Sequence, residues 1–241
     1  MLEVKKLKKC FGTFEAVKGI SFSVKKGEVL GFLGPNGAGK STTMRMITGF
    51  LPPTSGTAVI CGKDIIEEPV EAKSAIGYLP ESAPSYRQMI VEDYLKFIAE
   101  IRGFRGKAAK ERVESVIEKA KLQKVARKTI ETLSKGYRQR TCFAQAIIHD
   151  PQVLIMDEPT DGLDPNQKYT VRQMIKEMAS EKAIVISTHI LEEVDAVCTR
   201  AIVIADGEIK ADGTPAQLKA MDESGRLDVV FRNLTMGKTA V

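Results

Sequence analysis

The sequence is poor in the residues that build disulfide frameworks and histidine-based metal centres. Its 241 residues contain four cysteines and two histidines, His149 and His189. The cysteines are far apart, no two are spaced as Cys-x-x-Cys, and apolar residues surround them. We therefore expect reduced, buried thiols in a cytosolic protein, and no metal cluster built on histidine.

Long hydrophobic runs are missing as well. The longest unbroken run covers residues 201–205, far below the roughly 20 residues that a membrane-spanning helix needs. The N-terminus carries charges with no apolar run behind them, so we expect no signal peptide. If this protein works at a membrane, a partner must supply the membrane-spanning part.

The excess of positive charge is slight, because 36 basic and 31 acidic residues give a net charge of +5. Four of the residues at positions 5–9 are lysines, with Leu7 among them. Such lysines fit either the solvated face of an edge strand or attraction to an anionic membrane surface. The interruption by Leu7 favours the edge strand. A charge this small gives no footprint of nucleic-acid binding.

What is present is an alternation of strand and helix patterns. Short β-like runs dominate the first 80 residues, and a helix over residues 40–50 follows a glycine-rich loop. Over about residues 82–145 apolar residues recur at helical spacing, which predicts a helical insertion. Strands and helices then alternate, as in a parallel sheet covered on both faces. The expected strands are 3–9, 19–24, 28–33, 57–61, 75–79, 153–157, 183–187, 200–205 and 208–211, and the later helices are 166–180 and 191–198.

The glycine-rich loop at residues 34–41 fits the pattern G-x-x-x-x-G-K-[ST], with a predicted strand before it and a predicted helix after it. Such a loop lets backbone N–H groups converge on phosphate oxygens at the positive end of a helix. Lys40 should reach the β- and γ-phosphates, and the Ser41 hydroxyl should ligate Mg²⁺. The loop therefore predicts a nucleoside triphosphate site.

Two acidic residues close the apolar strand at 153–157. Asp157 ends the strand, beside the ligand crevice of a parallel sheet, and is expected to serve the Mg²⁺ site. Glu158 follows it, placed to orient or deprotonate a water that attacks the γ-phosphate. His189 comes after the strand at 183–187, at the same sheet edge, where a neutral imidazole could donate a hydrogen bond to the γ-phosphate.

These pieces, in this order and with this helical insertion, resemble the nucleotide-binding domain of ABC transporters. The resemblance spans roughly residues 2–220. It implies an α/β P-loop NTPase of the ABC type, with a parallel core in a mixed sheet, an antiparallel β-subdomain and an inserted helical subdomain. The implied domain is residues 1–220, followed by a short C-terminal tail over residues 221–241.

The resemblance also assigns residues to ATP and Mg²⁺. Phe11 matches the aromatic that stacks on adenine, Val17 falls near the nucleoside, and residues 133–137 sit at the signature motif, which caps the γ-phosphate of a second subunit. Glu158 and His189 take the catalytic positions. The implied Mg²⁺ residues are Ser41, Glu81 and Asp157. The implied ATP-binding residues are Phe11, Val17, Gly34, Asn36, Gly37, Ala38, Gly39, Lys40, Ser41, Thr42, Ser134, Lys135, Gly136 and Asp164.

Three residues depart from the family's usual pattern. Lys135 and Tyr137 stand where the signature usually has glycine and glutamine, and Glu81 replaces the glutamine of the Q-loop. A carboxylate at position 81 can still ligate Mg²⁺. These departures resemble the bacterial exporter branch called type 2, and they leave the cargo open.

The resemblance implies an ATPase subunit that pairs head to tail with an identical or similar subunit. It would drive a separate transmembrane permease from the cytoplasmic face of the cell membrane, and its coupling surface would lie near residues 82–91. An ABC-type ATPase acting on the ribosome or on nucleic acid is the alternative, although such proteins carry two motif sets or a long coiled coil. A scaffold without turnover is disfavoured, because Lys40, Asp157, Glu158 and His189 occur together.

Overall fold

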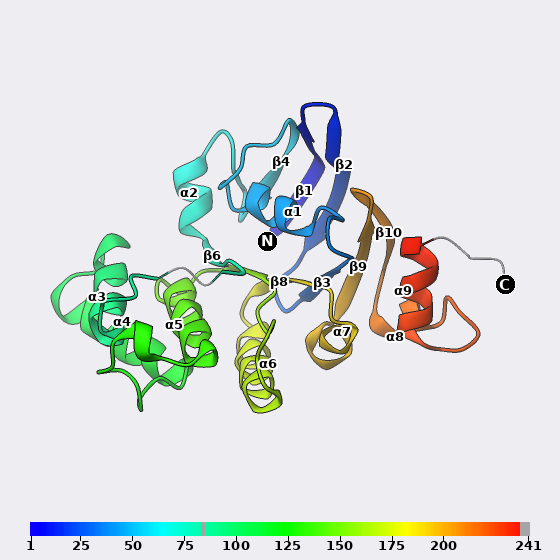
Figure 1. Ribbon diagram of the computed structural model, residues 1–241. Helices are drawn as coiled ribbons and strands as arrows, with labels where there is room; N and C mark the ends of the chain where they lie inside the picture. Colours follow the sequence, from blue (N-terminus) through cyan, green and yellow to red (C-terminus); the bar gives the residue numbers. More distant parts are fainter. Residues whose placement is uncertain (83–84, 237–241) are drawn as a thin grey trace.

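The computed structural model describes residues 1–82 and 85–236, which form two sheets with helices around them (Figure 1). The larger sheet has the strand order β10-β9-β3-β8-β7-β6. Its strands β6 to β9 and β3 are parallel, and β10 is antiparallel to β9. The parallel core and the mixed sheet are confirmed. The bounds are β3 Val29–Leu33, β6 Ile76–Leu79, β7 Val153–Asp157, β8 Ala183–Thr188, β9 Arg200–Ala205 and β10 Glu208–Gly213.

The smaller sheet is antiparallel and has the order β2-β1-β4-β5. It contains β1 Leu2–Phe11, β2 Phe14–Val24, β4 Ser55–Ile60 and the short β5 Lys63–Asp64, which the sequence did not predict. β1 pairs with both β2 and β4, so the expected edge strand is an interior strand. The lysines still lie on its solvated side, since Lys5 pairs with Glu3 and Lys8 pairs with Glu15.

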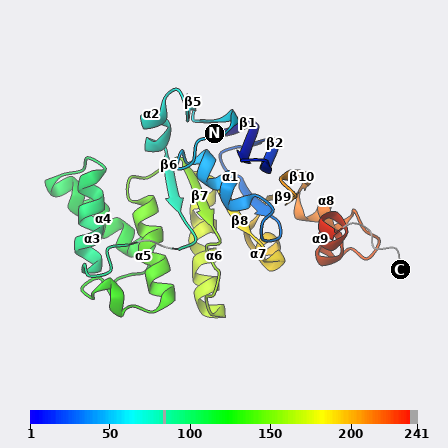
Figure 2. The same cartoon turned by 45° about the horizontal axis from the view of Figure 1, so that its top comes forward.

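Helix α1 (Lys40–Ile47) lies between the two sheets, and the other long helices of the core lie on the opposite side of the larger sheet (Figures 1 and 2). Those helices are α5 Lys135–Ile147, α6 Pro165–Ala179 and α7 Leu191–Val197. Each side has its own hydrophobic cluster of buried side chains. The apolar strands β3, β7 and β8 are buried along their whole length because both faces are covered.

The helical insertion forms one end of the molecule (Figure 1). It contains α3 Val91–Ile101, α4 Gly106–Lys119, the 3₁₀ turn η1 Ile130–Thr132 and α5. Apolar residues of α3 and α4 at helical spacing join the cluster below the larger sheet, as the periodicity predicts. A short helix, α2 Pro69–Ser74, precedes β6 and was not predicted.

The C-terminal segment is folded over its described residues. Helix α8 covers Pro215–Lys219, and α9 covers Leu227–Met236. Leu227 is buried in the cluster that contains β9 residues, and Val230 is buried as well, so this part of the expected tail packs on the core. The last part of that tail, residues 237–241, lies outside the described residues.

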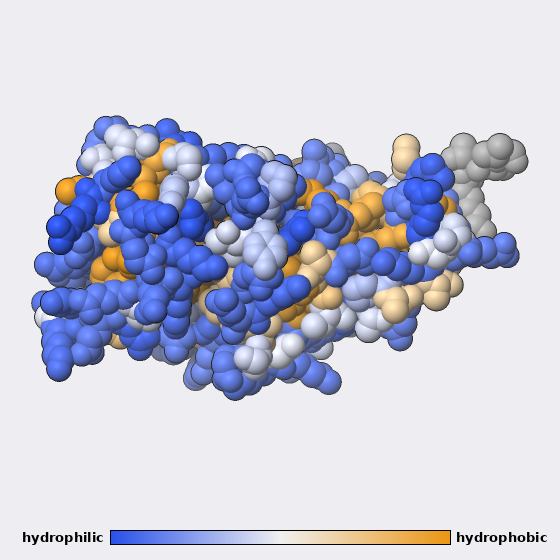
Figure 3. Space-filling view, turned by 90° about the horizontal axis from the view of Figure 1, so that it is seen from below, coloured by the Kyte–Doolittle hydropathy of each residue, from blue (hydrophilic) through white to orange (hydrophobic). Residues whose placement is uncertain are grey.

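The surface agrees with the composition. Seen from below, it is mostly hydrophilic, with hydrophobic side chains in patches between charged ones (Figure 3). Within residues 1–82 and 85–236, no helix is both long enough and apolar enough to cross a bilayer. All four cysteines are free thiols, as expected, but only Cys142 and Cys198 are buried, and Cys10 and Cys61 are partly exposed.

Candidate functional site

A pocket of about 570 Å³ opens where the carboxyl ends of β3, β7 and β8 meet the start of α1. This is the edge at which open parallel sheets bind ligands. Ten of the residues expected to serve ATP, Mg²⁺ or catalysis line it. They are Phe11, Asn36, Gly37, Gly39, Lys40, Ser41, Thr42, Glu81, Glu158 and His189, and the remaining lining residues are Phe14, Ala16 and Asp161.

The glycine-rich loop turns directly into α1 at the pocket floor. Gly39 is the N-cap residue at φ 100, a backbone conformation that favours glycine, and a Cβ there would lie 2.5 Å from the carbonyl oxygen of Ala16. The loop therefore packs against β2, while part of it lines the pocket together with the N-terminus of α1. Such an N-terminus is a ready anion site. Gly34 and Ala38 do not line the pocket, because Ala38 is buried and a Cβ on Gly34 would clash with Ile204.

Lys40 and Glu158 form a buried charge pair on the pocket wall. The Lys40 ammonium donates to the carbonyl oxygens of Gly34 at 2.8 Å and Pro35 at 3.2 Å, and it lies 3.7 Å from Glu158 Oε1. Glu158 has a left-handed backbone at φ 49, which costs about 1 kcal/mol for a residue with a side chain. Buried charges need partners of this kind, and both groups keep contact with the pocket.

His189 lies beside the same carboxylate. Its Nδ1 is 3.0 Å from Glu158 Oε2, and the imidazole is partly exposed. A carboxylate only accepts, so Nδ1 carries the proton in this contact. Neutral His189 then presents a lone pair at Nε2. The hydrogen bond to a γ-phosphate expected of a neutral imidazole requires protonation of His189 or release of the ring from Glu158.

Of the three residues expected to hold Mg²⁺, Ser41 and Asp157 are in contact, and Glu81 lines the same pocket as Ser41. The Ser41 hydroxyl donates to Asp157 Oδ1 at 3.2 Å, and Ser187 donates to the same oxygen. Within the described residues no group of three His, Cys, Asp or Glu side chains could enclose a metal ion. Mg²⁺ bound through phosphates takes only one or two protein oxygens and keeps waters, so this oxygen donor set fits it.

Tyr78, on β6, lies near the carboxylates of Asp157 and Glu81. Burial, together with the nearby charge of Asp157, raises the pKa of Tyr78 to about 12, while Arg45 opposes the shift. The phenol therefore stays protonated at neutral pH and can act as a donor beside the carboxylates.

The other end of the pocket is apolar and corrects one expectation. Phe11 lines it as expected, together with Phe14 and Ala16. Val17 does not, because it is fully buried among the residues between the sheets. Gly19, at φ 81, interrupts the alternation of β2, so Val17 shares the buried side with Ile20. Sequence reasoning missed Phe14 and Ala16, since no sequence pattern showed the irregular register of β2.

Four expected ATP residues lie outside the pocket, at the N-termini of α5 and α6. Ser134 is the N-cap of α5 and Asp164 is the N-cap of α6. Gly136 is buried against α6, where a Cβ would clash with Gln167. The Lys135 ammonium lies 3.6 Å from Asp161 Oδ2, and Asp161 lines the pocket. Lys135 thus joins the signature loop to the wall of its own pocket, a contact that no sequence pattern indicated.

Comparison with known proteins supplies relatives for this arrangement. The family model described as "ABC transporter" matches residues 17–161. The chain is 37% identical over 221 residues to "Probable multidrug ABC transporter ATP-binding protein YbhF" of Escherichia coli, which covers 91% of this chain and 38% of YbhF. It is 41% identical to "Linearmycin resistance ATP-binding protein LnrL" of Bacillus subtilis, covering 90% of this chain and 70% of LnrL.

A solved "Structure of ATP binding subunit of ABC transporter" superposes with a TM-score of 0.86 at 28% identity, covering 97% of this chain and 99% of the other. The chain therefore spans less than two fifths of the length of YbhF but nearly the whole of that solved subunit.

Proposed function

This chain belongs to the ABC transporter family, and from that premise we propose that it binds and hydrolyses ATP to drive a separate membrane permease. The observation that carries the proposal is the convergence of Lys40, Glu158 and His189 in one pocket, beside the Ser41–Asp157 pair. A phosphate loop alone would support nucleotide binding only. A carboxylate placed at the phosphate end supports turnover as well.

The chemistry follows from what each side chain can do. Lys40 and the α1 N-terminus neutralise the phosphates, and Phe11 supports the base. Glu158 accepts a proton from the attacking water or orients it, and His189 holds the Glu158 carboxylate through Nδ1. Ser41, Asp157 and Glu81 would hold Mg²⁺, which neutralises charge on the phosphates when it is bound.

We further propose that two subunits close head to tail around two ATP molecules. Support comes from the four expected ATP residues at the N-termini of α5 and α6, none of which lines the pocket of its own subunit. In a pair, Ser134 and the N-terminus of α5 would meet the phosphates held by the partner. The partner ATPase is a second copy of this chain or a close homologue.

A groove between the core and the helical insertion supports the permease proposal. It measures about 830 Å³ and is lined by Tyr78 and Pro80 from the core side and by Ile98, Ile101 and Arg102 from α3. Ile101 and the neighbouring Phe50 are large exposed apolar side chains, typical of a docking surface. Ser82 lines the groove, but residues 83 and 84 of the expected coupling surface lie outside the described residues.

The direction of transport and the location are part of the proposal. The relatives are named for multidrug transport and linearmycin resistance, and export fits both names. The subunit would lie on the cytoplasmic side of the cell membrane, bound through the permease. No direct contact with nucleic acid is expected, since the net charge is only +5.

The test is an affinity purification of the full chain from detergent-solubilised membranes of its host, with ATP present. We expect a protein with several membrane-spanning helices to co-purify, together with a second ATPase copy. Deletion of the apolar contact by Ile101→Asp should release the membrane protein, whereas Val70→Asp, an exposed apolar residue outside the groove, should not. Recovery of ribosomes or nucleic acid alone would favour the alternative function.

A further inference from the structure

Phe14 is an exposed aromatic residue for which the proposed reaction has no role so far. Its side chain is 63% exposed, and that of Phe11 is 51% exposed. A single exposed apolar side chain is ordinary on a protein surface. Two of them at the mouth of the same pocket, on either side of one tight turn, are a more specific feature.

The strand register places both rings on one side of the hairpin. Phe11 and Phe14 are direct cross-strand partners, so their side chains project from the same face. Ala16 lies two residues farther along β2 and also lines the pocket. Its small side chain leaves room beside Phe14. Neither ring contacts another aromatic ring in the described part of the chain, so the two rings do not stack on each other.

Phe14 is also held at a fixed place relative to the phosphate loop. The carbonyl oxygen of Ala16 packs so closely that a Cβ on Gly39 would lie 2.5 Å away, and one on Gly207 would lie 2.9 Å away. The N–H of Lys18 donates to the Gly207 carbonyl at 2.9 Å. The start of β2 is thus clamped between the phosphate loop and the β9–β10 turn. A rigid anchor loses little entropy when it binds a ligand.

The chemistry of this end of the pocket points to a nucleobase. Phe11, Phe14 and Ala16 have no polar side-chain atoms. The charged lining residues belong to the phosphate end of the pocket, and they are Lys40, Glu81, Glu158 and Asp161. The Lys9 ammonium lies 5.3 Å from the Phe11 ring centroid, so Phe11 already makes a cation–π contact. Flat aromatic bases bind such apolar surfaces by stacking and van der Waals contact.

We propose that Phe14 is a second base-contacting residue, which binds the purine of ATP together with Phe11 and thereby contributes to affinity and base selection. This rests on the proposed function, because it requires the triphosphate to lie on the phosphate loop. Phe14 would act on the base alone and leave the phosphate contacts unchanged.

The experiment compares ATP with inorganic tripolyphosphate, which has phosphates but no base. Both are titrated calorimetrically into the full chain in EDTA, which keeps ATP unhydrolysed. We expect Phe14→Ala to weaken ATP binding about five- to tenfold and to leave tripolyphosphate binding unchanged. Phe14→Tyr, which keeps the ring, should bind ATP as the wild type does.

The matched control is Tyr169→Ala, which removes an aromatic side chain of the same exposed fraction, 63%, outside this pocket and should alter the binding of neither ligand. Equal ATP affinity in Phe14→Ala and wild type would overturn the proposal, and so would an equal loss for ATP and tripolyphosphate. If the wild type binds neither ligand, the proposed function fails instead. If it binds both and only the Phe14 dependence is absent, the proposed function stands without this contact.

Discussion

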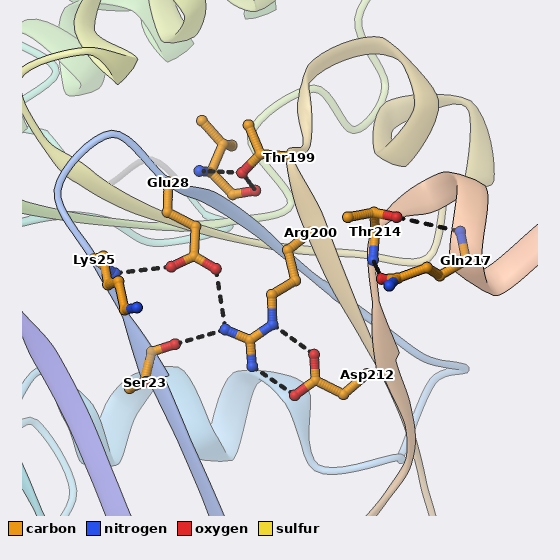
Figure 4. Close-up of polar contacts among 9 residues, drawn as sticks. Ser23, Lys25, Glu28, Thr199, Arg200, Asp212, Thr214 and Gln217 are labelled. Carbon is orange, nitrogen blue, oxygen red and sulfur yellow. Dashed lines mark hydrogen bonds and ion pairs between the residues drawn. The ribbon is translucent and has the colours of Figure 1, made fainter.

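Two charge clusters at opposite edges of the larger sheet differ in how they use their partners. Lys40, Glu158 and His189 meet at the carboxyl ends of the parallel strands. Arg200 begins β9 at the other edge, where its guanidinium joins Asp212 and Glu28 (Figure 4). Both clusters combine ion pairs with backbone carbonyls, and the residues of the first cluster line the pocket described above.

The Arg200 cluster is closed on itself. Two guanidinium nitrogens donate to the two oxygens of Asp212 at 2.6 Å, and the third donates to Glu28 at 3.0 Å and to the Ser23 carbonyl at 2.9 Å. Glu28 in turn accepts from the Lys25 N–H at 2.8 Å (Figure 4). These bonds, led by the pair with Asp212, raise the pKa of Arg200 above its ordinary value. The cluster ties β2, β3, β9 and β10 together.

The comparison distinguishes charged groups that stabilise the fold from charged groups that can bind a ligand. All three guanidinium nitrogens of Arg200 donate to protein atoms, and these bonds hold strands of the fold together. Lys40 also donates to protein carbonyl oxygens, but the lysine itself lines a pocket, where phosphate oxygens can replace those acceptors. We therefore expect substitutions in the Lys40 cluster to change ATP binding or hydrolysis, and substitutions in the Arg200 cluster to change the free energy of unfolding.

The largest expected effect is on turnover. Glu158→Gln should keep ATP binding and lower the hydrolysis rate by about 10² to 10⁴, because an amide cannot accept the proton of the attacking water. A phosphate-release assay and calorimetry on the same preparation measure the two properties. Glu181→Gln, an exposed residue paired with Lys26, is the control and should keep full turnover. Undiminished hydrolysis in Glu158→Gln would remove Glu158 from the reaction.

The next effect is on affinity. Lys40→Ala should weaken ATP binding at least about 100-fold, roughly 3 kcal/mol, because it removes the one ammonium on the described pocket wall. Circular dichroism should confirm that the variant is folded, since Glu158 loses a buried partner. Lys26→Ala removes an exposed lysine and should bind ATP normally. Normal ATP affinity in Lys40→Ala would contradict the phosphate-loop assignment.

The second cluster should respond in the opposite way. Arg200→Ala should lower the free energy of unfolding by about 2–3 kcal/mol, because Asp212 and Glu28 lose their charged partner. Its affinity for ATP should not change. Arg226→Ala breaks a similar two-bond pair with Asp228 that is well exposed, so urea unfolding should detect no change in stability. Loss of ATP binding in Arg200→Ala at equal folded fraction would erase the distinction between the clusters.

His149 adds a third case to this comparison, a titratable group that burial keeps neutral. Its Nε2 lies 2.9 Å from the Ile76 carbonyl, and burial, with Arg102 nearby, lowers its pKa to about 4. Between pH 6.5 and 4 the unfolded chain therefore binds more protons at this residue, so stability falls as the pH falls through that range. We expect a loss of about 2 kcal/mol by pH 4.

His149→Gln should flatten that part of the stability curve, because glutamine can donate to the same carbonyl without titrating. Urea unfolding at several pH values between 7 and 4 provides the measurement. Identical curves for the variant and the wild type would show that other groups cause the acid sensitivity.

Much of the site was predictable because it is built from short continuous segments. The loop from Gly34 to Ser41 and the strand end at Asp157 and Glu158 each carry their geometry in neighbouring residues. The apolar runs of β3, β7 and β8 likewise predict buried parallel strands. Tertiary contacts decided the rest. The pairing of β1 with β4 cannot be read from the sequence, so the lysines of β1 resembled those of an edge strand.

The sequence by itself determined a phosphate loop, two carboxylates and a histidine at the ends of predicted strands, because the order of these segments along the chain and their side-chain chemistry can be read directly. Only the tertiary structure decided that Ala16 and Phe14, and not Val17, face the pocket, since a bulge at Gly19 reverses the faces of β2. It also decided that Lys135 reaches Asp161, because helix packing sets which loops meet.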